Sequence, residues 1–171
     1  VVIADEKKLH GIGGVMGGLE GGCSLNTTNV FLEVALFDPI SVTKTGRKLN
    51  IQSDARFRFE RGMDSTSIDW GVDKATEMIL NLCGGKVSKV TSDKSEEHRK
   101  KIIKYDLKKT KNLSGVEINS NNQIKILKNL GFEIKSQSKD FIIIAVPYFR
   151  PDIDGKADIV EEIIRIYGFD K

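Results

Sequence analysis

A short, strongly charged stretch divides this sequence into two halves of different composition. It covers Lys86–Lys101 and ends in the run DKSEEHRKK, from Asp93 to Lys101. A stretch of this kind forms a linker or an exposed edge, because it offers too few apolar side chains for a core. We therefore expect two small domains with an α+β fold, at residues 1–90 and 95–171.

The composition is that of an ordinary globular protein. Of the 171 residues, 39% are hydrophobic and 30% are charged, so disorder is not indicated. The net charge of +3 permits contact with RNA but does not require it. No apolar run approaches the ~18 residues of a membrane span, and two cysteines do not make a disulfide framework. We expect a cytoplasmic protein without membrane contact.

Both ends of the sequence look internal to a longer chain. The start, VVIADEKK, has neither an initiator methionine nor the form of a signal peptide, and it has the pattern of a strand entered midway. The last residues, IYGFDK, stop directly after a predicted helix. We expect this chain to be a fragment.

The first half is rich in glycine and apolar strand patterns. Strands are predicted at Val1–Ala4 and Asn29–Phe37, the second with two alternating apolar faces. Asp38 and Pro39 form a helix start, and a helix is expected from there toward Arg47. Arg56–Arg61 alternates basic and apolar residues, which is typical of a strand or of an RNA-contacting segment. A longer helix follows, ending at Gly84.

The second half has its own pattern of strands and helices. A strand is predicted at Ile102–Tyr105, and a helix runs from Ser120, which has capping-box form, to Gly131. A hairpin is expected from Phe132–Lys135 and Phe141–Val146. A last helix covers Asp158–Tyr167. A helix, a hairpin and a second helix resemble a winged-helix layout.

The glycines between Gly11 and Gly22 do not form a dinucleotide-binding motif. The G-x-G-x-x-G fingerprint from Gly11 needs a glycine at position 16, where this chain has Met16. Two interpretations stay open. The glycines serve a turn that needs positive φ, or they form a pocket wall where a substrate approaches bare backbone.

Glu33 lies in the middle of an apolar predicted strand, between Phe31 and Ala35 on one face. A carboxylate in such a place is costly without partners. One interpretation is a salt bridge to an arginine among residues 47–61. The other is an acceptor that recognises a polar group in a mostly apolar pocket.

Four acidic residues gather around the start of the last helix: Asp152, Asp158, Glu161 and Glu162. The last three stand at i, i+3 and i+4, so they share one region of the helix surface. Their charges repel one another unless a cation or arginines intervene, and hard oxygens of this kind suit Mg²⁺. The alternative is a solvated acidic first turn, which the helix dipole favours modestly.

Several strings resemble the β subunit of bacterial phenylalanyl-tRNA synthetase. They are VVIAD, GIGGVMGG, NVFLEVALFDP, SDARFRFERGMD and VPYFRPDIDGKADIVEEIIRIYGFD, in the order of that family and over nearly the whole chain. The last string is the most specific. The resemblance implies a ligase that attaches phenylalanine to its tRNA using ATP. It also implies a heterotetramer of two α and two β subunits, in which the β subunit edits wrongly attached tyrosine by hydrolysis.

The resemblance also assigns parts to the two halves. Residues 1–90 resemble the C-terminal part of the tRNA-editing domain, built on a mixed sheet. Residues 95–171 resemble the small DNA-binding-like domain that follows it. The partners implied are the α subunit and tRNA(Phe).

Individual site residues follow from the same resemblance. Gly17, Glu33, Ser53 and Ala55 match positions of the editing pocket, where Glu33 would accept a hydrogen bond from the tyrosine hydroxyl. Ser53 replaces the threonine common there and loses a methyl group. Asp152, Asp158, Glu161 and Glu162 match a Mg²⁺ site shared with the α subunit. The pocket histidine of the family lies upstream, so we expect no catalytic residue in this chain.

Two functional hypotheses therefore remain. The chain is part of an editing tRNA ligase and is catalytically inert by itself, or it is a non-catalytic RNA- or protein-binding scaffold module. Deacylation of mischarged tRNA distinguishes them.

Overall fold

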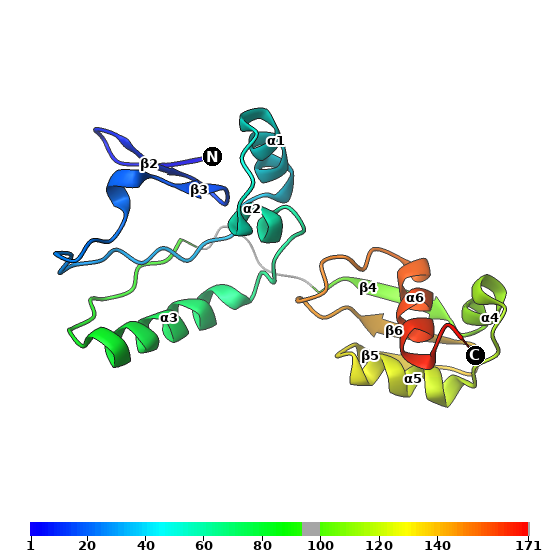
Figure 1. Ribbon diagram of the computed structural model, residues 1–171. Helices are drawn as coiled ribbons and strands as arrows, with labels where there is room; N and C mark the ends of the chain where they lie inside the picture. The colour runs from blue at the N-terminus through cyan, green and yellow to red at the C-terminus, as the bar shows by residue number, and fades with distance from the viewer. Residues whose placement is uncertain (94–99, 171) are drawn as a thin grey trace. The chain divides into compact units, whose positions relative to one another are not determined.

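The computed structural model describes residues 1–93 and 100–170 and divides the chain into two compact units, Val1–Glu96 and Glu97–Lys171 (Figure 1). The linker predicted around 86–101 falls partly on 94–99, outside the described residues. Within the described ranges the fold is α+β, with two antiparallel three-stranded sheets and six α-helices.

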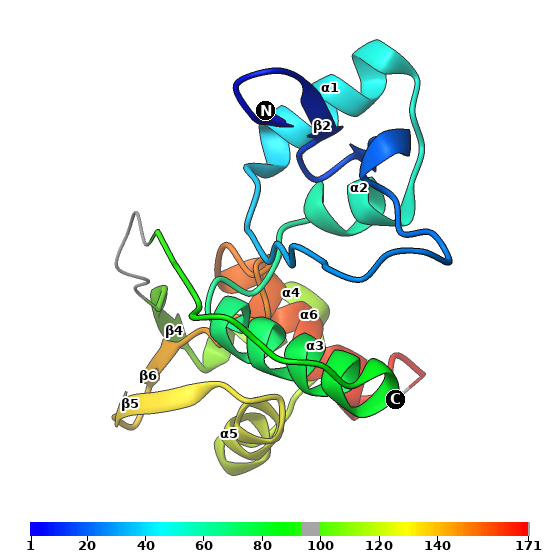
Figure 2. The same ribbon diagram turned by 90° about the vertical axis from the view of Figure 1, so that its left-hand side faces the viewer.

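The first unit combines a small sheet with three helices (Figure 2). Its elements are β1 (Val2–Ala4), β2 (Leu9–Ile12), β3 (Met16–Gly17), the 3-10 turn η1 (Leu19–Gly21), α1 (Pro39–Leu49), α2 (Asp54–Phe59) and α3 (Ser67–Cys83). The three strands pair antiparallel in the order β1-β2-β3. The α1 helix starts as predicted, because the Asp38 side chain accepts a hydrogen bond from the Ser41 amide at 2.7 Å.

The glycine segment of the first unit forms a tight turn. Gly14, between β2 and β3, has φ +69°, and a Cβ there would lie 2.9 Å from Cγ2 of Val42. A Cβ at Gly18 would lie 2.5 Å from the carbonyl oxygen of His10. These positions therefore need glycine for conformation and for close packing, as the turn interpretation predicted.

Two strand predictions in the first unit are wrong. Residues 27–38 have no strand assignment, because a strand needs a neighbour and no other described segment pairs with this one. Arg56–Arg61 is not a strand either, since residues 54–59 form α2. The alternation of basic and apolar residues was a misleading signal there. The Ser53 side chain caps this helix by accepting a hydrogen bond from the Arg56 amide at 3.1 Å.

The second unit packs three helices against a sheet. Its elements are β4 (Ile102–Asp106), α4 (Lys108–Ser114), α5 (Ser120–Asn129), β5 (Glu133–Gln137), β6 (Phe141–Ala145) and α6 (Lys156–Tyr167). The predicted hairpin is present, and β6 lies in the middle of the antiparallel order β4-β6-β5. The sequence pattern missed α4, and the α5 cap is Asn119 rather than Ser120.

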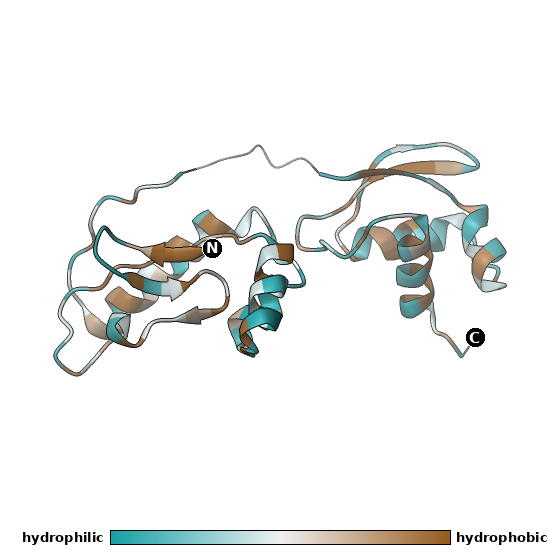
Figure 3. Cartoon of the chain, turned by 90° about the horizontal axis from the view of Figure 1, so that it is seen from above, coloured by the Kyte–Doolittle hydropathy of each residue, from teal (hydrophilic) through white to brown (hydrophobic). Residues whose placement is uncertain are grey.

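A single core holds the second unit together. Its fifteen buried residues come from the sheet, the helices and the connections between them, and Ile142, Ile144, Ile159 and Ile163 are completely buried. Figure 3, coloured by hydropathy, shows apolar strands and helices with one polar and one apolar side. Of the helices in residues 1–93 and 100–170, none combines the length and apolar character needed to cross a lipid bilayer.

Candidate functional site

The glycine turn and the start of α2 meet around the side chain of Ser53. Its hydroxyl donates to the carbonyl oxygen of Val15 at 2.5 Å while it caps α2. Val15 is almost fully buried, so this contact fixes the turn to the helix. Of the predicted pocket residues, Gly17 lies two positions beyond Val15 and Ala55 lies two beyond Ser53. These three residues therefore belong to one region of the first unit.

Gly17 leaves its surroundings open. A Cβ at this position would meet no atom within 4 Å, in contrast to the crowded Gly14 and Gly18. Its conformation and packing therefore do not require glycine, and the turn alone does not account for it. Ala55 is half-buried in the first turn of α2.

Glu33 lies in the unpaired extended segment between η1 and α1, and its side chain is exposed. The predicted salt bridge to an arginine of residues 47–61 is absent in the described structure. Arg56 and Arg61 both pair with Glu60, at 3.1 and 3.2 Å. The segment is anchored farther along, where the Phe37 ring meets Phe59 edge-on, with 5.2 Å between the ring centroids. Glu33 is therefore a carboxylate free of ion pairs within residues 1–93 and 100–170.

Two of the four acidic residues around α6, Asp152 and Glu162, contact arginines rather than an open space. Glu162 is buried, and its Oε2 accepts hydrogen bonds from Arg150 Nη1 and Arg165 Nη2, both at 2.7 Å. Arg150 also holds Asp152 through two hydrogen bonds, at 2.9 and 2.6 Å. One guanidinium group therefore joins the loop before α6 to the middle of that helix.

The pKa values in this network follow from its charges. The hydrogen bonds from Arg150, and then those from Arg165, lower the pKa of Glu162 to about 2. The hydrogen bonds from Arg150 also lower the pKa of Asp152. Asp152 and Glu162 in turn raise the pKa of Arg150 above its ordinary value. The network is thus fully ionised at neutral pH.

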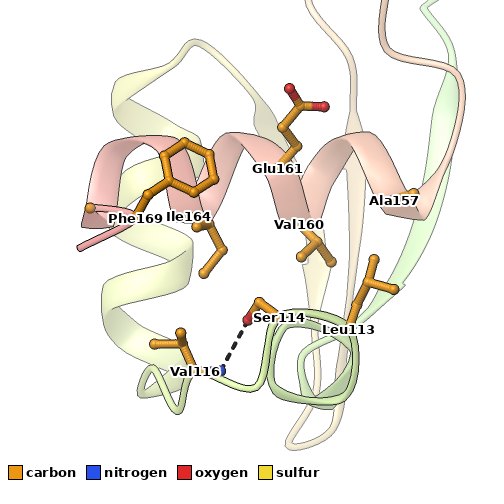
Figure 4. A pocket seen from close by; sticks show the side chains of 9 residues that line it. Leu113, Ser114, Val116, Ala157, Val160, Glu161, Ile164 and Phe169 are labelled. Atoms are coloured by element: carbon orange, nitrogen blue, oxygen red, sulfur yellow. Dashed lines mark hydrogen bonds between the residues drawn. The ribbon is translucent and has the colours of Figure 1, made fainter. Parts of the chain in front are cut away.

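Asp158 and Glu161 have different surroundings. Oδ2 of Asp158 accepts hydrogen bonds from the backbone amides of Asp154 and Gly155, at 2.8 and 2.7 Å, and so caps the first turn of α6. Glu161 has no ion pair with any described residue. Its side chain lies at the edge of an open, mostly apolar depression of about 440 Å³ between α4 and α6, lined also by Leu113, Val160 and Phe169 (Figure 4).

The donors at this site fit Mg²⁺ in kind, since carboxylate oxygens are the ligands that it prefers. Their arrangement leaves few oxygens for a metal ion, because both oxygens of Asp152 and both oxygens of Glu162 accept hydrogen bonds from arginine. Across residues 1–93 and 100–170, no three His, Cys, Asp or Glu side chains are grouped so as to hold a metal ion. The oxygens left uncommitted are those of Glu161 and one of Asp158.

Sequence reasoning named arginines as one way to neutralise this cluster but did not identify them. The signal was available for Arg165, which stands three residues after Glu162 on the same helix face. For Arg150 it was weaker, because its contact with Glu162 depends on how the loop folds back.

Comparison with known proteins defines the class first. The B3/4 domain family matches residues 1–84, and the tRNA synthetase B5 domain family matches residues 103–169. The chain therefore has the domain content of part of an aminoacyl-tRNA synthetase.

Individual relatives then identify the family within this class. The chain is 44% identical over 168 residues to the phenylalanine–tRNA ligase beta subunit of Mesorhizobium japonicum. It is 45% and 41% identical over 170 residues to those of Bartonella quintana and Brucella suis. These alignments cover 98–99% of this chain and 21% of each relative. The chain belongs to the phenylalanine–tRNA ligase β subunit family, and it spans about a fifth of the length of the relatives that it matches.

Proposed function

We propose that this chain forms part of a phenylalanine–tRNA ligase β subunit, whose enzyme attaches phenylalanine to tRNA(Phe) with ATP in the cytoplasm. Support comes from the order of the two matched domains and from the identity over nearly the whole chain. The partners are the α subunit, in a heterotetramer, and the tRNA. The observation that carries the proposal is the continuous 44% identity across both units.

In this proposal residues 1–90 contribute one wall of a pocket that edits tyrosine attached to tRNA(Phe). Gly17 leaves room for a substrate, and the exposed Glu33 carboxylate is free to accept a hydrogen bond from the tyrosine hydroxyl. A site with such an acceptor discriminates strongly, because phenylalanine leaves the acceptor unpaired. Ser53 and Ala55 shape the wall on the side of α2. By itself the chain is catalytically inert.

The second unit, in the same proposal, is a winged-helix-like domain that carries a Mg²⁺ half-site. Asp152, Asp158, Glu161 and Glu162 would hold the ion, with further ligands from the α subunit. Support comes from the donor type and from the uncommitted oxygens of Glu161 and Asp158. A bound ion would neutralise the acidic surface where the two subunits meet. Asp152 and Glu162 can join only if Arg150 and Arg165 release some of their oxygens.

A chimeric β subunit tests the proposal. The matching region of the Mesorhizobium japonicum subunit is replaced by this chain, and the chimera is expressed with the α subunit of that organism. We expect a complex that forms Phe-tRNA(Phe) and hydrolyses Tyr-tRNA(Phe). A folded chimera that failed to bind the α subunit, or that bound it without supporting either reaction, would contradict the proposal.

A further inference from the structure

Positive charge is concentrated on α1, on α2 and on the residues directly after α2. Residues 39–61 hold six lysines and arginines against two acidic residues, a net charge of +4, whereas the whole chain carries +3. The exposed cations among them are Lys44, Arg47, Lys48, Arg58 and Arg61. Arg47, Lys48 and Arg58 form no ion pair with any residue of 1–93 or 100–170. A surface of this charge attracts an anionic ligand.

The helices α1 and α2 pack against each other, so their cations belong to one part of the fold (Figure 2). Gly46 of α1 is buried where they meet, and a Cβ there would lie 2.4 Å from Cδ of Arg56 on α2. Arg56 donates to the carbonyl oxygen of Ile51 at 2.6 Å and pairs with Glu60 at 3.1 Å. These contacts fix Arg56 in the packing between the helices, and they leave the other cations on the surface.

An aromatic ring and a guanidinium group are stacked at the end of α2. Phe57 is 59% exposed, and Cζ of Arg61 lies 3.7 Å from the centre of its ring. Nη1 of Arg61 also donates to the carbonyl oxygen of Phe57 at 2.6 Å and to Oε1 of Glu60 at 3.2 Å. The position of the guanidinium group is therefore fixed before any ligand binds. An exposed ring beside fixed cations is a surface on which a nucleobase can stack.

This stack lies one helical turn from the wall of the proposed editing pocket. The amide of Phe57 donates to the carbonyl oxygen of Ser53 at 2.9 Å, and Ala55 stands between them in the sequence. One turn of an α-helix measures about 5.4 Å along its axis. An amino acid ester held at the pocket wall therefore keeps the nucleotides to which it is attached within reach of Phe57.

We infer that α2 carries a subsite for the single-stranded 3′ end of an RNA, in which one base stacks on Phe57 and phosphates meet Arg58 and Arg61. This inference rests on the proposed function and adds to it: the pocket wall takes the amino acid, and the subsite takes the nucleotides. A base that stacks on a side chain is unpaired, so the ligand is a single strand rather than a duplex. A role for Arg61 only in ending α2 explains its bond to the Phe57 carbonyl, but it requires neither an exposed ring nor the excess of positive charge.

Fluorescence anisotropy of a short, labelled RNA ending in CCA, titrated with the isolated chain, tests the inference. Phe57→Leu should weaken binding on the order of 5- to 150-fold and leave the slope of log K against log salt unchanged, because the ring carries no charge. Arg58→Gln should reduce that slope by about 0.7, the value for one phosphate contact of a single strand. Phe57→Tyr, which keeps an aromatic ring, should bind as the parent chain does.

The matched control is Trp70→Leu, since Trp70 is an aromatic residue of α3 that is 69% exposed and lies outside residues 39–61. This variant should bind the RNA as the parent chain does. Unchanged binding by Phe57→Leu, or an equal loss in Trp70→Leu, would overturn the inference.

The chimeric β subunit separates this inference from the proposed function. In the chimera, Phe57→Leu should raise the KM for deacylation of Tyr-tRNA(Phe) and leave kcat nearly unchanged, because the subsite binds nucleotides away from the ester bond. An active chimera whose KM is the same with Phe57→Leu would overturn the RNA subsite alone. An inactive chimera, together with RNA binding by the isolated chain that depends on Phe57, would contradict the proposed function alone.

Discussion

Glu33 and Glu162 are both acidic residues, and the structure places them in different environments. Glu162 is buried and bonded to two arginines, so its charge is satisfied inside the chain. Glu33 is exposed and has no ion pair within the described residues. A buried, paired carboxylate already has its partners inside the chain, whereas an exposed carboxylate without an ion pair is available to a ligand.

Glu33→Ala in the complete enzyme should reduce its preference for tyrosyl over phenylalanyl esters more than it slows hydrolysis itself. The lost hydrogen bond to a charged acceptor is worth about 1.5–3 kcal/mol, or roughly a 10- to 150-fold loss of discrimination. Deacylation rates of the two esters give the ratio. Glu33→Gln, which keeps an acceptor oxygen, should retain more of it. If the Ala variant kept the full preference, Glu33 would have no recognition role.

Glu162→Gln should lower the free energy of unfolding of the second unit by about 1.5–3 kcal/mol in Mg²⁺-free buffer, because two charged donors lose a charged acceptor. Hydrogen exchange of the β6 amides measures the free energy of unfolding of this unit alone. The matched control is Glu161→Gln, one residue away and without an ion pair, which should stay within about 0.5 kcal/mol of the parent chain.

The same pair of variants predicts a pH dependence. The pKa of Glu162 falls from 4.5 to about 2 on folding, so the unfolded chain binds more protons between these values. Its contribution to stability is therefore complete above pH 4.5 and is lost as the pH falls toward 2. The parent chain should lose stability faster than Glu162→Gln across this window. Parallel pH profiles for the two proteins would show that the arginines do not depress this pKa.

At the scale of elements, the sequence predicted what local chemistry decides. The cap at Asp38, the hairpin at residues 132–146 and the last helix all depend on neighbours within a few residues, and the structure contains them. The strand predicted at residues 29–37 is absent, since strand formation requires a partner and periodicity does not supply one. Helix α2 was not predicted, because six residues are too few to show a helical period. The only sequence signal for this helix is the capping residue Ser53.

In the candidate sites, too, features set by near neighbours in sequence could be predicted, and features set by distant contacts could not. The acidic residues around α6 could be found from their spacing, because a helix fixes the directions of residues i, i+3 and i+4. Their neutralisation by Arg150 could not, since that contact spans twelve residues and depends on the path of a loop. The open surroundings of Gly17 likewise depend on what packs nearby.

A buried polar chain fixes α4 and α5 to the sheet of the second unit. The Thr110 hydroxyl donates to Gln123 at 2.8 Å, so the Tyr105 hydroxyl, 2.6 Å away, must donate to Thr110. Burial raises the pKa of Tyr105 to about 12. Gln123 completes the chain by donating to the carbonyl oxygens of Leu107 and Ile118.

Thr110→Val should destabilise the second unit by about 1–3 kcal/mol, because it leaves a buried donor and a buried acceptor without partners. Tyr105→Phe removes only the outer donor and leaves the bond between Thr110 and Gln123 intact, so its effect should be smaller. Urea unfolding followed by exchange of the β6 amides measures both. Equal losses for the two variants would show that the order of donors in this chain is different.

Across the whole chain, the two units differ in how much of their apolar surface is buried and how many of their polar groups are paired. The second has a closed core, satisfied buried polar groups and an internally neutralised acidic cluster, so it should fold without metal. The first relies on a few glycine and cap contacts and leaves apolar surface open. Stability is therefore distributed unevenly: the second unit has a closed core, and the first leaves apolar side chains exposed.

Titration with Mg²⁺ distinguishes a metal site that this chain forms alone from one that it shares with another subunit. Mg²⁺ needs about six oxygens near 2.1 Å and gives up its waters reluctantly. Of the four acidic residues around α6, only Glu161 and one oxygen of Asp158 make no hydrogen bond in the described structure, so we expect calorimetric titration of the isolated chain to show only weak, millimolar binding. Chelation by EDTA should leave its stability unchanged. With the α subunit present binding should tighten, and Glu161→Lys should weaken α–β assembly while the isolated chain stays folded. Micromolar affinity without the α subunit would show that α6 and its loop suffice, and that Arg150 yields its carboxylates to the ion.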